Sequence, residues 1–140
     1  MDKVIKETLR LFPPSSQTFR RTIKPVEFDG FTIPENTYVR LSMDFIHQMP
    51  EYWHQPDQFD PERFADNRAE HKKHPFQYIP FGGGAHKCIG MHFADFEVKT
   101  VLFHLLKNYR IEIEPGYEVK YHYLPVPKPI DNLPLKLIKR

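Results

Sequence analysis

The chain has 140 residues, of which 40% are hydrophobic and 27% are charged, so it suits one folded domain and is not disordered. Its formal net charge is only +2 and its basic residues are scattered, which gives no support for a nucleic-acid partner or a polybasic membrane patch. The apolar runs are too short for a transmembrane helix, and the charged first residues are unlike a signal peptide. One cysteine excludes an internal disulfide and suits a reducing, cytoplasmic compartment.

The amino-terminal half begins with a predicted helix and continues as short strands. Residues 2–12 carry apolar side chains near helical spacing, and Pro13-Pro14 ends this helix because proline lacks an N–H and restricts the residue before it. Residues 18–42 are typical of short strands, with Asp29-Gly30 as a hairpin turn. Residues 43–48 favour a short helix.

The carboxy-terminal half contains a long irregular stretch followed by a long helix. Residues 50–87 are rich in proline, glycine and aromatic residues. Such a long loop in a compact domain is usually functional or held by contacts with other parts of the chain. Residues 89–107 are apolar nearly all round, which predicts a buried helix. Residues 110–138 favour short strands broken at Pro115-Gly116 and Pro125–Pro129. The predicted fold is therefore mixed α and β, with short antiparallel strands.

The only cysteine follows a glycine-rich loop, in the stretch Phe81-Gly-Gly-Gly-Ala-His-Lys-Cys-Ile-Gly90. Glycines at 82, 83, 84 and 90 allow positive φ and close approach of the backbone to a flat ligand. Backbone N–H groups at the start of the next helix favour a thiolate, the form of cysteine that binds haem iron. The alternative reading of these residues alone is a free, buried cysteine beside a tight turn.

The spacing of Phe81, Gly84, Cys88 and Gly90, extended by Ala94, resembles the haem-binding signature of the cytochrome P450 family. Five fixed identities at fixed spacing make this resemblance far more specific than a lone glycine motif. It implies that Cys88 is the axial ligand of the haem iron and the catalytic residue, and that Phe81 packs beside the sulfur. It also implies a cofactor, haem b (iron protoporphyrin IX), that is approached by the loop and helix at Gly82, Gly84, Gly90 and Ala94.

Two further motifs agree with this family. The run Glu7-Thr8-Leu9-Arg10 resembles its Glu-x-x-Arg helix, and Pro61-Glu-Arg-Phe64 resembles its Pro-Glu-Arg-Phe loop. The resemblance implies a buried structural triad of Glu7, Arg10 and Arg63. From the residues alone, Glu7 and Arg10 are an exposed helix pair worth roughly 0.2–0.5 kcal/mol, and Arg63 is a surface arginine.

The remaining site residues come from their positions relative to these motifs. Arg20 lies ten residues after Arg10, where the family places an arginine that binds a haem propionate; the alternative is a solvated strand end. At position 86 the family most often has arginine, and His86 is expected to hydrogen-bond a propionate. The segment that passes over the haem and touches substrate corresponds to Ser15, Ser16, Gln17 and Thr18. The ending Pro129–Pro134 is weakly similar to the retinoid and sterol branches.

The resemblance covers almost the whole chain but only about the last third of a family member. Residues 1–140 are therefore expected to be the carboxy-terminal portion of one mainly α P450 domain, lacking the distal helix and any amino-terminal anchor. The implied activity of the parent is that of a monooxygenase, an oxidoreductase that inserts one oxygen atom from O2 into an apolar organic substrate. The implied electron donor is a ferredoxin, a flavodoxin or a flavoprotein reductase. The fragment alone is expected to be inactive. The parent is expected to be cytoplasmic, or membrane-associated if its amino-terminal part carries an anchor.

Two alternatives remain at this point. Cys88 with His92, four residues apart on the predicted helix, and His71 with His74 offer ligands for a zinc module, although structural zinc sites usually carry paired cysteines. A haem-thiolate sensor or peroxygenase is the other alternative, since the residues that decide between these chemistries lie outside the chain.

Overall fold

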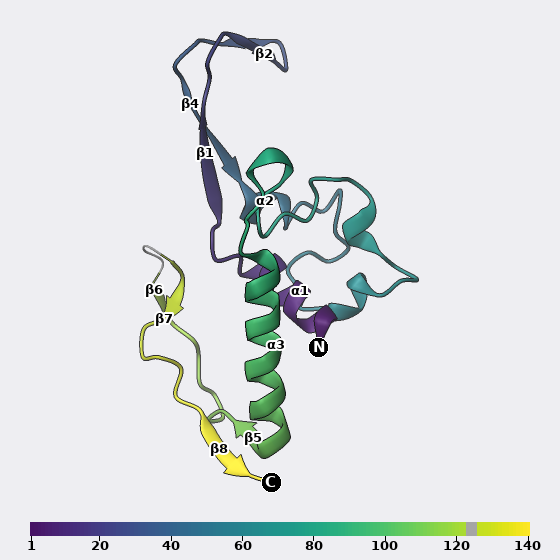
Figure 1. The fold of residues 1–140 in the computed structure, drawn as a ribbon, viewed down its shortest axis with the longest axis vertical. Helices are drawn as coiled ribbons and strands as arrows, with labels where there is room; N and C mark the ends of the chain where they lie inside the picture. Colours follow the sequence, from purple (N-terminus) through teal and green to yellow (C-terminus); the bar gives the residue numbers. More distant parts are fainter. Residues whose placement is uncertain (123–125) are drawn as a thin grey trace. The chain divides into compact units, whose positions relative to one another are not determined.

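The computed structural model describes residues 1–122 and 126–140 of the chain. Its contacts divide the chain into two compact units, residues 2–80 and residues 81–140, the latter grouped with Met1. Both units contain helices and two-stranded antiparallel sheets (Figure 1), so the predicted mixed α and β class is confirmed.

The first unit opens with the predicted helix, α1 (Asp2–Leu11), which stops before Pro13-Pro14 as expected. One face of α1 is buried and carries Ile5, Glu7 and Arg10. This face therefore mixes one apolar side chain with two charged ones, and the charges require partners from elsewhere in the unit.

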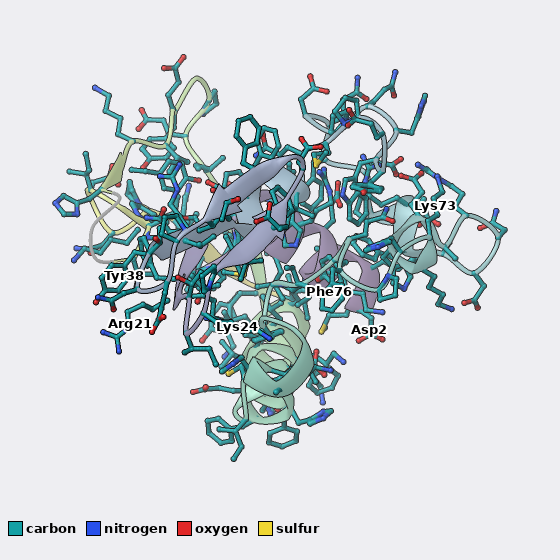
Figure 2. The ribbon with its side chains drawn as sticks, turned by 90° about the horizontal axis from the view of Figure 1, so that it is seen from above. Asp2, Arg21, Lys24, Tyr38, Lys73 and Phe76 are labelled. Atoms are coloured by element: carbon teal, nitrogen blue, oxygen red, sulfur yellow. The ribbon has the colours of Figure 1, made fainter. Side chains whose placement is uncertain are left out.

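Four strands follow and form two antiparallel ladders. Strand β1 (Gln17–Arg21) pairs with β4 (Tyr38–Ser42), and the ladder runs from Gln17 opposite Ser42 to Arg21 opposite Tyr38. The side chains of Arg21 and Tyr38 are labelled in Figure 2. Strands β2 (Val26–Phe28) and β3 (Phe31–Ile33) form a hairpin at the far end of the β1–β4 ribbon (Figure 1).

The hairpin turn is the one that the sequence predicts. Asp29 and Gly30 have φ angles of 48° and 78°, the left-handed pair that suits a two-residue turn between twisted strands. After β4 the chain continues directly into α2 (Met43–Ile46), shorter than the predicted helix at 43–48.

The irregular stretch that follows α2 contains two short 3-10 helices, η1 (Pro61–Phe64) and η2 (Glu70–Lys72). Trp53, only 1% exposed, packs on Phe64 with ring centroids 5.9 Å apart, and its indole N–H donates to the carbonyl of Ile46 at 3.2 Å. The stretch is thus held by side-chain contacts between distant residues, and these contacts explain why it lacks periodicity.

The second unit contains η3 (Gly84–His86), the long helix α3 (Met91–Asn108) and two small sheets. Strand β5 (Tyr109–Glu112) pairs with β8 (Lys136–Lys139), and β6 (Tyr121–His122) pairs with β7 (Lys128–Pro129). The predicted break at Pro115-Gly116 is a turn with Gly116 at φ 80°. Of the other predicted break, Pro125 lies outside the described residues.

The prediction that the long helix is buried is wrong for this chain. Within the described residues, no side chain of α3 is buried, and Phe93, Phe96 and Phe103 are 69%, 68% and 53% exposed. A helix that is apolar on every side needs neighbours on every side, and these residues do not supply them. In the described part of the chain, no helix combines the length and apolar character of a membrane span.

Candidate functional site

The cysteine loop, Phe81–Gly90, presents the only thiol of the chain at the surface. The side chain of Cys88 is exposed, and the Cys88 N–H donates to the Phe81 carbonyl at 2.8 Å, which closes the loop on itself. Inside the loop, the 3-10 turn η3 forms where the His86 N–H donates to the Gly83 carbonyl at 3.3 Å. These backbone bonds fix the cysteine without covering its sulfur.

Two of the four glycines of the loop have backbone conformations that other residues rarely adopt. Gly82 has φ +73°, and a Cβ there would lie only 3.0 Å from the His86 carbonyl oxygen, so the loop itself requires glycine. Gly84 has φ +60°, but a Cβ there would meet nothing within 4 Å. Gly83 and Gly90 have φ angles of −152° and −81° and do not use this freedom.

Helix α3 begins directly after the loop, with Gly90 as its N-cap. The Ala94 N–H donates to the Gly90 carbonyl at 2.9 Å, and a Cβ added at Gly90 would lie 3.8 Å from Cys88 Sγ. The sulfur therefore lies beside the first turn of α3.

This donor set fits a haem iron. It offers one soft sulfur ligand, exposed on a closed loop, with open space around Gly84 where a flat group can approach the backbone. His86 is exposed on the same loop.

Arg20 and the segment 15–18 lie in the other unit. The Arg20 guanidinium donates to the Thr18 hydroxyl at 3.0 Å and to the Phe19 carbonyl at 2.8 Å, within its own strand. The Ser15 hydroxyl donates to the Gln17 carbonyl at 3.0 Å, and the Ser16 carbonyl accepts from the first residues of α2. These contacts order the segment 15–18 as the link between α1 and β1.

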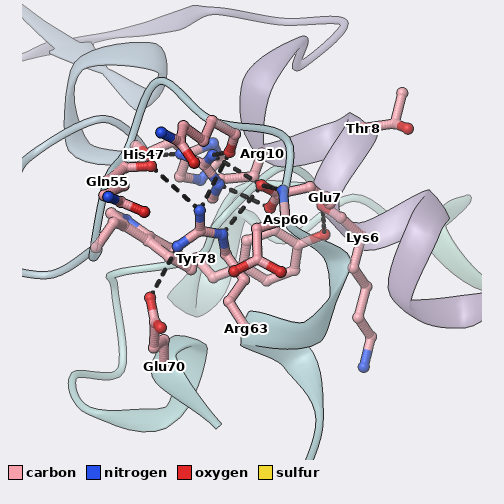
Figure 3. Close-up of polar contacts among 12 residues, drawn as sticks. Lys6, Glu7, Thr8, Arg10, His47, Gln55, Asp60, Arg63, Glu70 and Tyr78 are labelled. Carbon is pink, nitrogen blue, oxygen red and sulfur yellow. Dashed lines mark hydrogen bonds and ion pairs between the residues drawn. The ribbon is translucent and has the colours of Figure 1, made fainter. Parts of the chain in front are cut away.

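Glu7, Arg10 and Arg63 are brought together in the first unit, and all three side chains are 0% exposed (Figure 3). Glu7 Oε2 accepts from Arg10 Nε at 2.8 Å, and Glu7 Oε1 accepts from Arg63 Nε at 3.0 Å. The Asp60 N–H also donates to Glu7 Oε1 at 2.9 Å. Glu7 thus connects α1 to η1 through charge-assisted hydrogen bonds, which are roughly twice as strong as neutral ones.

The two guanidinium groups also satisfy backbone carbonyls of the irregular stretch. Arg10 donates to the carbonyl of His47 at 2.7 Å, and Arg63 donates to that of His54 at 2.8 Å. Both arginines donate to the Gln58 carbonyl, at 3.2 and 3.1 Å. Because a segment without regular secondary structure leaves carbonyls unpaired, the two arginines act as substitutes for a backbone ladder.

A second carboxylate, that of Glu70, belongs to this cluster and is marked by no sequence motif. Glu70 Oε2 accepts from Arg63 Nη1 (Figure 3) at a distance of 2.9 Å. The other carboxylate oxygen of Glu70 accepts from Arg68 at 2.5 Å. Burial raises the pKa of Glu70, but hydrogen bonds from Arg68, the His54 N–H and Arg63 outweigh burial and hold the pKa below its usual range. We call Glu7, Arg10, Arg63 and Glu70 the charge cluster.

Three other polar residues lie around the charge cluster, and two of them had no sequence motif to reveal them. Arg68 donates to Asp60 at 2.6 Å as well as to Glu70. Gln77 is fully buried and donates from Nε2 to the carbonyls of Tyr52 and Glu70, at 2.9 and 2.8 Å. Only Asp60 carried a local signal, because it directly precedes Pro61 and caps η1 by accepting the Glu62 N–H.

The zinc alternative loses its geometric basis. Cys88 lies in the turn before α3 and not on the helix with His92, because α3 begins at Met91. His71 packs its ring on Phe64, with centroids 5.0 Å apart. Among the described residues, no group of three or more His, Cys, Asp or Glu side chains is arranged to hold a metal ion.

Comparison with known proteins agrees with the motifs. A family profile described as "Cytochrome P450" matches residues 1–134. A cytochrome P450 of Mycobacterium tuberculosis is 42% identical over all of this chain and 29% of its own length, and cytochrome P450 26B1 of Xenopus tropicalis is 38% identical over 97% of this chain and 27% of its own length.

A solved structure is similar over nearly the whole chain. The retinoic acid-bound cyanobacterial CYP120A1 is 35% identical and superposes with a TM-score of 0.93 over 99% of this chain and 32% of that one. The chain therefore spans about a third or less of the length of the proteins that it matches. From the family profile, these identities and the cysteine loop together, this chain belongs to the cytochrome P450 family.

Proposed function

We propose that the full-length protein is a haem-thiolate monooxygenase and that these 140 residues are the carboxy-terminal portion of its P450 domain. The family implies a haem cofactor and monooxygenase chemistry in general. The single observation that carries the proposal to this chain is the exposed thiol of Cys88 on a closed, glycine-rich loop at the start of α3.

The cysteine, the phenylalanine and the glycines of the loop each have a role in this proposal. Cys88 supplies the axial thiolate to the iron of haem b, Phe81 packs beside the sulfur, and the glycines leave the backbone free to approach the porphyrin. When bound, the haem supplies the activation of O2 and the insertion of one oxygen atom into an apolar substrate, with electrons from a redox partner. That partner is proposed to be a ferredoxin, a flavodoxin or a flavoprotein reductase.

The outer contacts of the haem are assigned to Arg20 and His86. Both can donate charge-assisted hydrogen bonds to propionate groups, each worth roughly 1.5–3 kcal/mol. Ser15–Thr18 are proposed to touch the substrate. A retinoid-like apolar substrate is supported by the similarity to CYP120A1, whose structure contains retinoic acid, and by the ending Pro129–Pro134.

The test is the ferrous carbon monoxide spectrum of the full-length protein. Thiolate ligation gives a red-shifted Soret band, and Cys88→Ser is expected to abolish both this band and substrate oxidation. The matched control is His92→Ala, which removes another candidate ligand of the zinc alternative and is expected to leave the band unchanged. Retention of the red-shifted band in Cys88→Ser would show that Cys88 is not the ligand.

A further inference from the structure

His47, the residue that follows α2, is fully buried and is bonded on two sides. Its backbone carbonyl accepts from Arg10 Nη1 at 2.7 Å, and its ring Nε2 accepts from the Ile79 N–H at 2.9 Å. Figure 3 shows His47 beside Arg10 and the charge cluster. One residue thus joins the buried charges of α1 to a backbone amide more than thirty positions further along the chain.

The bond to Ile79 fixes the protonation of the ring. Because Nε2 accepts a hydrogen bond, it carries a lone pair, and the proton of a neutral ring must then lie on Nδ1. Nδ1 is buried, and no hydrogen-bond partner for it is found among the described residues. In a protonated ring Nε2 would also carry a hydrogen, and two N–H donors would then face one another. Only the neutral ring is therefore compatible with this contact.

Ile79 stands two residues before Phe81, where the cysteine loop begins. A chain advances at most about 3.3–3.6 Å per residue, so a fixed Ile79 holds Phe81 within about 7 Å. The neighbouring Tyr78 is anchored as well, because its hydroxyl donates to the Lys6 carbonyl at 3.0 Å. The segment that leads into the loop is therefore tied to α1 by Tyr78 and to α2 by His47.

We propose that His47 is a positioning residue for Cys88: its neutral ring holds the Ile79 amide, and its carbonyl ties that anchor to Arg10 of the charge cluster. This positioning role rests on the proposed function, in which Cys88 binds iron. Every other part of the proposal concerns hydrogen bonds within residues 2–80.

The surroundings of the ring give the anchor a pH dependence. Burial lowers the pKa of His47 to about 4, and the charge of Arg10 acts in the same direction, while a hydrogen bond and Asp44 oppose it. The Tyr78 ring packs 5.5 Å from the imidazole. Because the folded state binds this proton less readily than the unfolded state, the stability that the neutral ring contributes is full above pH 6.5 and shrinks as the pH falls towards 4. Near pH 4 the ring itself becomes protonated in the folded state and the bond to Ile79 is lost.

The experiment compares His47→Gln with His47→Leu in the haem-loaded, full-length protein. Glutamine can present an acceptor to the Ile79 amide and does not titrate in this range, whereas leucine leaves the amide unsatisfied. His54→Gln is the matched control, since the His54 side chain is exposed in the same unit and its backbone bonds are unaffected. The first readout is hydrogen exchange of the Ile79 amide at pH 7, and the second is the fraction of thiolate-ligated ferrous haem.

We expect His47→Leu to speed exchange at Ile79 by roughly tenfold or more, in line with the loss of a partner for a buried amide, and to lower the thiolate-ligated fraction. His47→Gln and His54→Gln should keep the wild-type exchange rate at Ile79 and the wild-type thiolate-ligated fraction. Between pH 6.5 and 4, protection at Ile79 should fall in the wild type and stay constant in His47→Gln. If the His47→Leu variant does not fold, the pH comparison of the wild type with His47→Gln alone tests the proposal.

The proposal is overturned if His47→Leu keeps wild-type protection, if His47→Gln loses protection with acid as the wild type does, or if glutamine fails to fold while His54→Gln folds. Faster exchange with an unchanged thiolate-ligated fraction would overturn the positioning role. Absence of a thiolate spectrum in the wild type would instead overturn the proposed function, and exchange at Ile79 would still report the bond.

Discussion

The exposure of single side chains separates residues that can face a ligand from residues that hold the chain together. The thiol of Cys88 is exposed, whereas the charged groups of Glu7, Arg10 and Arg63 are 0% exposed. A buried charge is tolerated only when it is paired and hydrogen-bonded, as these three are. Their polar atoms are therefore used in holding the fold together and are not accessible to a ligand. The thiol of Cys88, by contrast, is free and exposed, so a ligand can reach it.

Arg20 and Arg21 provide a residue-scale prediction, because they are adjacent arginines on one strand. Arg20→Ala in the full-length protein is expected to speed haem dissociation, by about tenfold or more, since one charge-assisted hydrogen bond to a propionate is lost. The thiolate-type spectrum should not change. The measurement is transfer of haem to an excess of an apo-protein acceptor.

Arg21→Ala is the control for this experiment, because it removes the same charge from the neighbouring, exposed position. Equal haem dissociation rates in the wild type and both variants would remove Arg20 from the haem site.

At the scale of elements, the charge cluster joins α1, η1 and η2. Glu7, Arg10 and Arg63 alone would carry one net positive charge in a buried place, and Glu70 brings the sum to zero. The outer pair of Arg68 and Asp60 adds one further charge of each sign. The charge cluster thus joins three elements that are separate in the sequence, and its two arginines stack over the buried ring of Trp53.

Glu70→Gln tests this balance, because it keeps the shape and removes the charge. Breaking a buried ion pair costs about 3–5 kcal/mol, and we expect a loss of that order in the free energy of unfolding at pH 7, measured with urea. The pKa of Glu70 is lowered in the folded state, so its contribution is present above the unfolded pKa and is lost as the pH falls through the folded one. The difference between variant and wild type should therefore shrink in acid.

The control for Glu70→Gln is Glu62→Gln, which removes the same charge from η1 at a side chain that is 62% exposed and paired with Lys3. Surface pairs of this kind contribute about 0–1 kcal/mol. A similar loss in both variants, or a Glu70→Gln effect that is constant with pH, would argue against charge balance.

Sequence information predicted the elements whose signals are local. Asp29-Gly30 specified its hairpin, and Pro13-Pro14 ended α1, because turn and helix-stop chemistry involves neighbouring residues. The motifs at Glu7 and Arg63 came from a family resemblance. Glu70 and His47 could not be predicted from local patterns. Glu70 is seven positions from Arg63, and His47 is 37 positions from Arg10 and 32 from Ile79, so no periodic pattern connects them.

At the scale of the whole molecule, the unpartnered surface of α3 decides how these residues behave alone. The buried hydrophobic side chains among the described residues are Ile5, Met43, Trp53 and Phe64, all in the first unit. Apolar area left in water costs roughly 25 cal/mol per Å² relative to burial, and exposed patches of this kind favour aggregation.

We therefore predict that residues 1–140 expressed alone are poorly soluble, bind haem weakly and oxidise no substrate. The measurement is size-exclusion chromatography with a haem assay, followed by turnover with a redox partner and a panel of apolar substrates. A soluble monomer with one haem per chain and measurable turnover would contradict this prediction and show that these residues suffice for the chemistry.

The coordination of the iron tests the central claim most directly. X-ray absorption at the iron edge of the haem-loaded, full-length protein reports whether a sulfur atom is bound, independently of activity. We predict one sulfur ligand in the wild type and none in Cys88→Ser, because the substitution removes the only thiol of the cysteine loop. An iron without a sulfur ligand in the wild type, or with one that persists in Cys88→Ser, would contradict the assignment of Cys88 as the axial ligand.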